Sequence, residues 1–292
     1  DGAPGRGSNA MSVRMVWRKG LNGVMLSLTG LCALVAVSAL FVILGFLAWN
    51  GAQSIHWSFF TNLPRPTGET GGGIANAILG SAKLLLLAAG IGIPIGLIGA
   101  IYLAEYAGTG FAFFVRYAAD LLNGVPSIVI GIFAYAIVVV SMHHFSALAG
   151  GFALGIMMIP VILRSCEEFL KTVPRSLREG AMAVGASKWR TIVTVVVPAA
   201  SGGIITAILL ALARVAGETA PLLFTAFGNQ FWSSGFNQPT AALPMVIYNY
   251  AMSPYDDLHR QAWAAGLVLL GLVLFTNIAT RLVLARQTAQ GR

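Results

Sequence analysis

The stretch VPRSLREGAMAVGASKWRTIVTVVVPAASGGIITAILLALARVAGETAP, residues 173–221, decides the fold. Its first half, 173–198, is a basic polar segment, and its second half, 199–221, is an apolar helix with two charges, Arg214 and Glu218. Residues four apart share one face of a helix, so this pair is expected to lie together inside an apolar segment. A polar loop that leads into such a helix indicates a docking surface for another protein beside a path for a solute.

The overall composition is that of a membrane protein. Hydrophobic residues make up 57% of the 292 residues and charged residues only 10%, whereas a soluble domain carries about 25% charged residues. The net charge of +8 would suit a nucleic-acid partner, but basic cytoplasmic loops explain it equally well, and we expect no nucleic acid. Cys32 and Cys166 are expected to be unpaired, and no spacing of metal ligands is present.

The apolar segments predict an all-α, polytopic fold with six transmembrane helices. The expected spans are 21–49, 74–103, 121–142, 145–163, 198–224 and 262–284. In domain terms, we expect a cytoplasmic N-terminal segment (1–20, with 1–10 as a leader before a native start at Met11), the first helix with its outer loop (21–73), a core (74–286) with a cytoplasmic loop (164–197), and a tail (287–292).

Two details within the spans, and one segment between them, have structural consequences. Pro126 should kink the third span because proline lacks a backbone donor. The second span contains Gly90, Gly92, Gly96 and Gly99, a small-residue spacing that lets helix backbones approach closely. Residues 243–252 are expected to form a short interfacial or re-entrant helix.

The basic residues predict the orientation of the chain. Of the 18 Lys and Arg residues, only four lie outside the N-terminal segment, the tail and the expected inner loops: Arg65 and Arg260 in outer loops, and Lys83 and Arg214 in spans. Lys83 is expected to extend to the membrane surface. Cytoplasmic loops carry the excess of Lys and Arg, so both termini and the 164–197 loop are expected in the cytoplasm.

The cytoplasmic loop contains its own helix signals. Pro174 suits a helix start and Gly185 suits the position just after a helix end. Leu177, Ala181 and Val184 follow at i, i+4 and i+7, so they line one face. A short cytosolic helix has nothing of its own to bury that face. A groove on a partner is one interpretation, and an ordinary solvated loop is the other.

The segment 179–198 resembles the cytoplasmic signature of ABC-importer permeases, EAA-x3-G-x9-I-x-LP. The matching positions are Glu179, Gly180, Ala181, Gly185, Val195, Val197 and Pro198. Gly180 replaces an alanine of the family pattern, which weakens the helix. In that family the segment is the coupling helix that docks on an ATPase subunit. The resemblance therefore implies a type I ABC-importer permease fold and an ATPase-coupling role for Arg178, Glu179, Gly180, Ala181, Gly185 and Pro198.

A second resemblance is narrower. NGVPSIVIGIF (123–133) and ARVAGETAPLLFTA (213–226) are similar to the permeases of the phosphate-specific importers, and closer to their A-type than to their C-type subunit. This implies a subunit of the bacterial cytoplasmic membrane that moves inorganic phosphate. The implied partners are a homologous C-type permease, two ATP-binding subunits and an extracytoplasmic phosphate-binding protein.

The two charges in the fifth span carry the expected solute site. A charged residue at the centre of a bilayer costs about 2.5–3.5 kcal/mol, which indicates that Arg214 is kept for a reason. One explanation is a salt bridge with Glu218 that only pins the helix, and the other is an aqueous path for an anion. With the resemblance, we expect Arg214, Glu218, Thr219, Asn123 and Ser127 to line a translocation path.

Several functions are excluded or kept as rivals. No G-x-x-x-x-G-K-[ST] sequence is present, so ATP and Mg²⁺ are expected on a partner subunit and this chain is expected to be a transport subunit without cofactors or enzymatic activity. The rivals are a permease for another oxyanion, such as sulfate or molybdate, and a self-sufficient anion channel or membrane enzyme that uses Arg214 and Glu218.

Overall fold

The computed structural model describes residues 6–66, 69 and 71–290, without the side chains of 6–14, 16 and 283–290. Residues 1–5 of the expected N-terminal segment and residues 291–292 of the expected tail therefore lie outside the described residues. The elements, in which η marks a turn of π-helix, are α1 (Arg6–Ala52), α2 (Trp57–Thr61), α3 (Ala75–Glu105), α4 (Gly110–Gly124), α5 (Ser127–Ala134), η1 (Tyr135–Val139), α6 (Val140–Met142), α7 (Ala147–Lys171), α8 (Arg175–Ala183), α9 (Lys188–Thr191), η2 (Ile192–Val196), α10 (Val197–Ala199), α11 (Ser201–Ala216), α12 (Ala220–Leu223), α13 (Leu243–Ala251) and α14 (Asp256–Gln290).

The predicted all-α class is confirmed. Within the described residues the only β-type pairing is an isolated bridge between Phe227 and Thr240. The chain forms two units, residues 1–50 and residues 51–292. The first unit is most of α1, whose stretch Trp17–Ala52 is long and apolar enough to cross a membrane. The second unit contains all other helices.

Six spans are present only if two strongly bent helix pairs are each counted as one span. Four helices, α1, α3, α7 and α14, contain continuous apolar stretches long enough to cross a membrane. The third expected span is α4 followed by Ser127–Met142, bent by 104°, and the fifth involves Lys188–Ala199 followed by α11, bent by 71°. The boundaries expected for these spans, 121–142 and 198–224, are therefore wrong, because each span includes a helix that begins before the expected start.

Both bends occur at prolines. Val125 before Pro126 is extended, with φ −71° and ψ 130°, because the proline ring disfavours a helical conformation in the residue before it. The kink expected at Pro126 is therefore a complete break. Pro198 has no N–H to donate to the preceding turn, and the helix before it widens into η2 before it bends after Ala199.

The core of the second unit is the contact between α3 and α7. A side-chain carbon at Gly92 would lie 2.6 Å from Met158 Cβ, and one at Gly96 would lie 2.9 Å from Ile162 Cβ. Only glycine allows this approach, so the expected close packing of the second span is confirmed at Gly92 and Gly96. Gly90, by contrast, faces open space.

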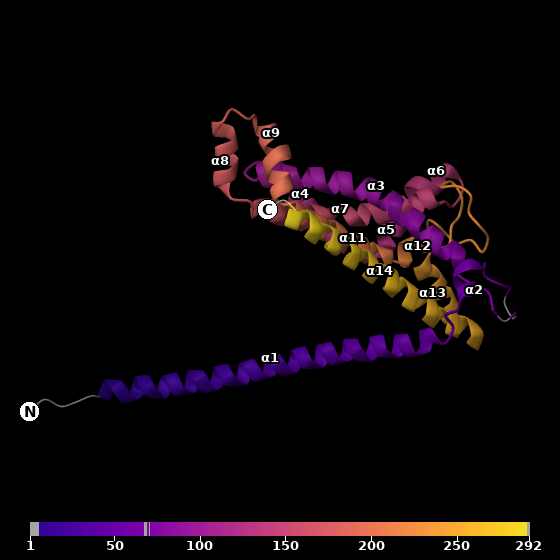
Figure 1. Ribbon diagram of the computed structural model, residues 1–292, viewed down its shortest axis with the longest axis horizontal. Helices are drawn as coiled ribbons and strands as arrows, with labels where there is room; N and C mark the ends of the chain where they lie inside the picture. Colours follow the sequence, from indigo (N-terminus) through magenta and orange to yellow (C-terminus); the bar gives the residue numbers. More distant parts are fainter. Residues whose placement is uncertain (1–5, 67–68, 70, 291–292) are drawn as a thin grey trace, which may run out of the picture. The chain divides into compact units, whose positions relative to one another are not determined.

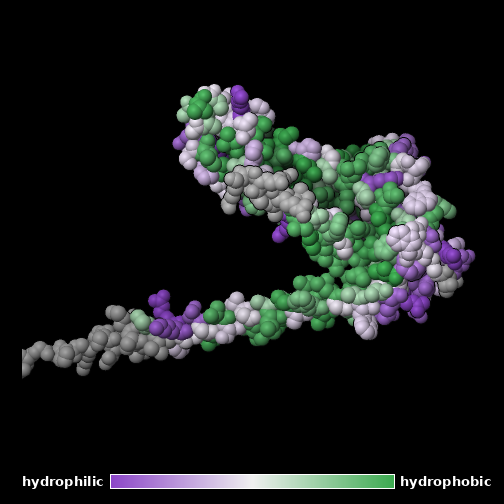
Figure 2. All heavy atoms as spheres, viewed as in Figure 1, coloured by the Kyte–Doolittle hydropathy of each residue, from purple (hydrophilic) through white to green (hydrophobic). Residues whose placement is uncertain are grey.

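Polar residues gather at two opposite ends of the second unit. Figure 1 shows α8 and α9 at one end of residues 51–292 and α2, α6 and α13 at the other. Figure 2 shows hydrophobic residues over the helices between them and hydrophilic residues near both ends. The expected short helix at 243–252 is confirmed as α13. Lys83 donates a hydrogen bond from Nζ to the carbonyl of Ser233, so it anchors the 225–242 segment.

Candidate functional site

The helix of the expected coupling segment is α8, and it has the predicted ends. Pro174 occupies its N-cap position, with φ −56° and ψ 141°. At the other end Gly185 has φ +87°, a left-handed conformation that glycine adopts without steric cost. The Gly185 N–H donates to the Met182 carbonyl at 3.0 Å, and the Ala186 N–H donates to the Ala181 carbonyl at 3.2 Å. These bonds satisfy carbonyls that the end of a helix leaves free.

The α8 helix is uncovered in this chain. None of its residues is buried, and the apolar side chains of Leu177 and Val184 are 48% and 86% exposed. Glu179 and Gly180 are exposed as well. An atom built as a side chain at Gly180 would meet nothing within 4 Å. This surface can therefore accept another protein at close range.

Arg178 differs from its neighbours on α8 because it turns toward the body of the protein. Its Nη2 donates to the carbonyl of Leu170 at 2.8 Å and lies 3.4 Å from the Oε1 atom of Glu105, at the end of α3. Its side chain is only 19% exposed. Of the residues expected to couple to an ATPase, Arg178 thus holds α8 in place, while Glu179 and Gly180 face outward.

The second part of the loop continues into the membrane helices. Ser187 caps α9 by accepting a hydrogen bond from the Arg190 N–H at 3.4 Å. After η2, Pro198 lies within α10, and α11 starts at Ser201 after the bend. The coupling segment is thus joined to the helix that carries Arg214 through a π-helical turn and a sharp change of direction.

Arg214 and Glu218 do not share a helix face, contrary to expectation. Helix α11 ends at Ala216, and the Gly217 N–H closes its end on the Arg214 carbonyl at 3.3 Å. Arg214 is exposed and Glu218 is half-buried, and among the described residues no ion pair joins them. Pro221 explains the early end, because proline cannot continue the hydrogen bonding of the preceding turn. The sequence therefore overestimated the burial of Arg214 within this chain.

Thr219, Asn123 and Ser127 lie at the breaks in the two bent regions. Thr219 precedes α12, while Asn123 and Ser127 lie on either side of the break between α4 and α5. Helix α5 packs on α12, since a side-chain carbon at Gly131 would lie 2.6 Å from the Cα of Pro221. This packing brings the two motifs close together in the structure.

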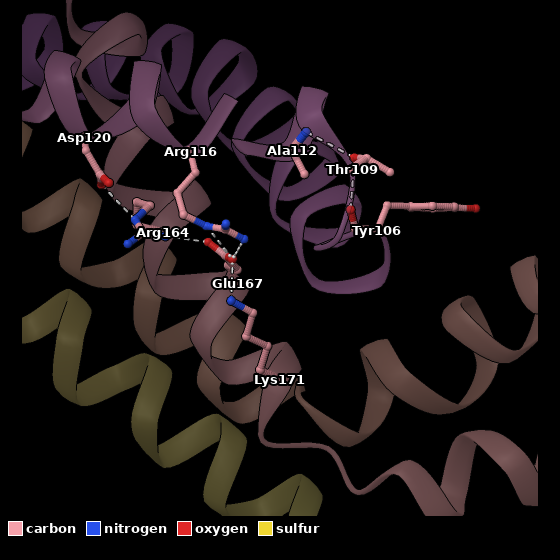
Figure 3. Close-up of polar contacts among 8 residues, drawn as sticks. All are labelled: Tyr106, Thr109, Ala112, Arg116, Asp120, Arg164, Glu167 and Lys171. Atoms are coloured by element: carbon pink, nitrogen blue, oxygen red, sulfur yellow. Dashed lines mark hydrogen bonds and ion pairs between the residues drawn. The ribbon is translucent and has the colours of Figure 1, made fainter. Parts of the chain in front are cut away.

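A charge cluster that sequence reasoning missed joins α4 to α7. The Glu167 carboxylate is fully buried and accepts hydrogen bonds from Arg116 Nη2 at 2.6 Å, Arg164 Nη1 at 2.7 Å and Lys171 Nζ at 2.5 Å. Arg164 Nε also pairs with Asp120 at 2.9 Å. Figure 3 shows the three cationic side chains converging on Glu167. The cluster fixes two helices of the expected translocation core to each other.

Part of this cluster had a signal in the sequence. Arg164 and Lys171 stand three residues before and four residues after Glu167, the spacings at which helix neighbours pair. The expected loop at 164–197 concealed them, because α7 extends to Lys171. Arg116 is 51 residues away from Glu167 in sequence, and no local pattern predicts such a contact. Arg116 and Asp120 fall between the expected second and third spans, 74–103 and 121–142, and lie on α4.

No group of three or more His, Cys, Asp or Glu residues that could hold a metal ion occurs within the described part of the chain. Cys32 is exposed and Cys166 is buried, and both are free thiols. Arg214 is an exposed cation that lies beside the end of α11.

Comparison with solved structures identifies the fold. The inward-facing MetNI methionine ABC transporter matches with a TM-score of 0.57 and 20% identity, covering 73% of this chain and 96% of that chain. A bacterial alginate ABC transporter in complex with an alginate pentasaccharide-bound periplasmic protein matches with a TM-score of 0.57 and 16% identity, covering 92% and 97%. At these identities the match establishes the type I ABC-importer permease fold alone.

Sequence comparison identifies the class. The family model of binding-protein-dependent transport system inner membrane components matches residues 92–288. The fold, the uncovered loop helix and this match define a multi-pass inner-membrane permease subunit of an ABC importer, which works in a complex with other subunits.

Relatives narrow the class further. The phosphate transport system permease protein PstA of Yersinia pestis is 43% identical over 275 residues, covering 94% of this chain and 93% of the relative. PstA of Haemophilus influenzae is 42% identical over 273 residues, covering 93% and 96%. PstA of Mycobacterium leprae is 38% identical over 212 residues, covering 72% and 70%. The chain belongs to the PstA family of phosphate transport system permeases.

Proposed function

We propose that this chain is the membrane-spanning subunit of an ATP-driven importer that moves inorganic phosphate across the bacterial cytoplasmic membrane. The observation that carries the proposal is the uncovered α8 helix with its Glu179-Gly180-Ala181 motif and Gly185 end, in a chain of the PstA family. An exposed amphipathic helix of this kind gains burial when a partner supplies a groove.

The energy comes from other subunits in this proposal. Two ATP-binding subunits hold ATP and Mg²⁺, and this chain binds no cofactor and performs no hydrolysis. A homologous C-type permease completes the membrane part, and an extracytoplasmic phosphate-binding protein delivers the solute. Both termini and α8 lie in the cytoplasm, as the distribution of basic residues favours.

The residues around the helix breaks suit phosphate. Arg214 offers a planar fork of donors that can hold two phosphate oxygens at once. Glu218 can accept a hydrogen bond from a protonated phosphate oxygen. Sulfate carries no proton at neutral pH and would leave the carboxylate unpaired, which is costly. Thr219, Asn123 and Ser127 supply further polar groups, and the C-type subunit would cover the exposed side of Arg214.

Coupling follows from the position of α8. Closure of the two ATP-binding subunits would draw the coupling helices of the two permeases together and open the cavity toward the binding protein. Phosphate would then pass the Arg214 region, and the return movement would open the cavity toward the cytoplasm.

Transport by reconstituted vesicles tests this proposal. The chain is co-expressed with its C-type and ATP-binding partners, and uptake of labelled phosphate from the loaded binding protein is measured with and without ATP. We expect uptake only with ATP and all partners, and competition by unlabelled phosphate but not by sulfate or molybdate. Phosphate movement by this chain alone, without nucleotide, would contradict the proposal.

A further inference from the structure

The end of α3 is contacted by two cations of the coupling loop, one from each side of Gly185. Arg178 of α8 approaches the Glu105 carboxylate at 3.4 Å. Lys188 of α9 donates from Nζ to the Glu105 carbonyl at 3.3 Å and lies 3.9 Å from the centre of the Tyr106 ring. Residues more than 70 positions apart in the chain thus converge on one helix end.

These contacts are chemically suited to a helix C-terminus. The last carbonyls of a helix have no partner inside it, and cations near that end are favourable because of the helix dipole. Lys188 supplies a donor to such a carbonyl and also lies over an aromatic face, where a cation is attracted. Tyr106 is itself stacked on Tyr102 of α3, with ring centres 5.3 Å apart.

The loop depends on polar contacts because α8 has little apolar attachment. None of its residues is buried, whereas Arg178 is mostly enclosed by the Leu170 carbonyl and the Glu105 side chain. The side chain of Glu105 is only 9% exposed. An enclosed ion pair therefore joins α8 to the end of α3.

Helix α3 in turn is packed closely against the core. Its Gly92 and Gly96 lie against Met158 and Ile162 of α7. Val215 of α11 belongs to the same buried cluster as Met158 and Ile162. Buried contacts therefore connect α3 to the residue next to Arg214, in addition to the covalent connection through Pro198.

The ion pair is incompletely formed in this conformation. Glu105 Oε1 and Arg178 Nε are both buried and have no hydrogen-bond partner. Buried polar atoms in proteins are nearly always paired. A modest shift of α8 toward α3 would let the Arg178 guanidinium grip the carboxylate with two hydrogen bonds, which satisfies both atoms.

We propose that Glu105 is a positioning residue for coupling: together with Arg178 and Lys188 it forms a clamp that tightens when α8 moves and carries that movement to α3. The inference rests on the proposed function, because α8 must receive the movement from an ATP-binding subunit. It assigns to Glu105 a role that is distinct from contact with the ATPase and from contact with phosphate.

The test compares transport with hydrolysis in the same vesicles, which contain the complete complex. The Glu105→Gln variant keeps the size of the side chain and removes its charge. We expect phosphate moved per ATP hydrolysed to fall about fivefold or more, the lower end of typical coupling between sites, while co-purification of the ATP-binding subunit stays unchanged. The Lys188→Gln variant should lower the same ratio less, because it leaves Arg178 and Glu105 in place.

Glu168→Gln is the matched control, since Glu168 is an exposed carboxylate on α7. The amount of phosphate that this variant moves per ATP hydrolysed should equal that of the original complex. A charge exchange, Glu105→Arg with Arg178→Glu, should restore part of the ratio. A Glu105→Gln complex with an unchanged ratio overturns the clamp, and so does a parallel loss of uptake and hydrolysis, which indicates a structural role alone. Absence of ATP-dependent uptake in the original complex would instead contradict the proposed function.

Discussion

Glu167 and Glu105 are two buried carboxylates near the loop end of the same helical unit, and they are neutralised differently. Glu167 accepts hydrogen bonds from three cations on α4 and α7, whereas Glu105 has one guanidinium, whose Nη2 lies 3.4 Å from Oε1 without forming a hydrogen bond. A satisfied cluster favours a single arrangement of its helices, and an unsatisfied pair leaves a second arrangement available. We therefore expect the Glu167 cluster to hold α4 and α7 in one arrangement, and the Glu105–Arg178 pair to allow α8 to shift relative to α3.

The largest effect on transport is expected at Arg214, a charged residue that differs from both Glu167 and Glu105. Arg214 is exposed and lacks a carboxylate partner among the described residues, so the comparison predicts that it serves a ligand and not the fold. Arg214→Ala should abolish ATP-dependent phosphate uptake, since each charge-assisted hydrogen bond lost is worth about 1.5–3 kcal/mol. Labelled-phosphate uptake measures this, with co-purification of the ATP-binding subunit unchanged. Normal uptake would remove Arg214 from the site.

Substitution of Glu167 tests how much the Glu167 cluster stabilises the complex. Glu167→Gln leaves Arg116, Arg164 and Lys171 around a neutral amide, and the complex should be destabilised by about 3 kcal/mol, the low end for breaking a buried pair because the cations are partly exposed. Thermal unfolding of the purified complex measures the loss. Glu168→Gln should unfold like the original, and equal stability of the two variants would mean that the cluster contributes little.

The end of the coupling helix is expected to show an intermediate effect. Gly185 has φ +87°, and Gly185→Ala should cost about 1–2 kcal/mol in that left-handed conformation. We expect the strained helix end to weaken docking, so less ATP-binding subunit should co-purify. Gly202→Ala, at an exposed glycine of α11 where an added side-chain carbon would meet nothing within 4 Å, serves as the comparison. If both variants retain the subunit equally, the turn at Gly185 does not set the position of α8.

The smallest effect is expected at the rim of the Glu167 cluster. Asp120 pairs with Arg164, but its side chain is 51% exposed, and exposed ion pairs contribute only about 0–1 kcal/mol. Asp120→Asn should therefore change thermal unfolding slightly, and less at high salt than at low salt. A loss as large as that of Glu167→Gln would show that the cluster depends on all of its members and not on the buried carboxylate.

Much of the fold follows from the sequence because its signals are local. Long apolar runs predicted the helices, Pro174 and Gly185 predicted the ends of α8, and the glycines of the second span predicted close packing at Gly92 and Gly96. Each of these features depends on residues within one or two helical turns. The sequence also located Pro126, where the third span bends, but it did not predict the bend that follows Pro198.

The structural features that the sequence did not predict depend on contacts between residues far apart in the chain, or on the angle of a helix bend. A proline indicates a break but not its angle, so the 104° turn after α4 was expected as a kink. The Arg214–Glu218 pairing assumed a continuous helix that Gly217 and Pro221 interrupt. The contacts Arg116–Glu167 and Arg178–Glu105 join separate helices, and no spacing in the chain specifies them.

The 71° bend after Ala199 has a mechanical consequence. A push along the axis of the Lys188–Ala199 arm arrives mostly across the axis of α11, because the two directions are far from parallel. Helix α11 would then tilt sideways and would not slide lengthwise, so the Arg214 guanidinium would keep a similar depth in the membrane. Under the proposed function, the solute would therefore meet this charge at the same level throughout the transport cycle.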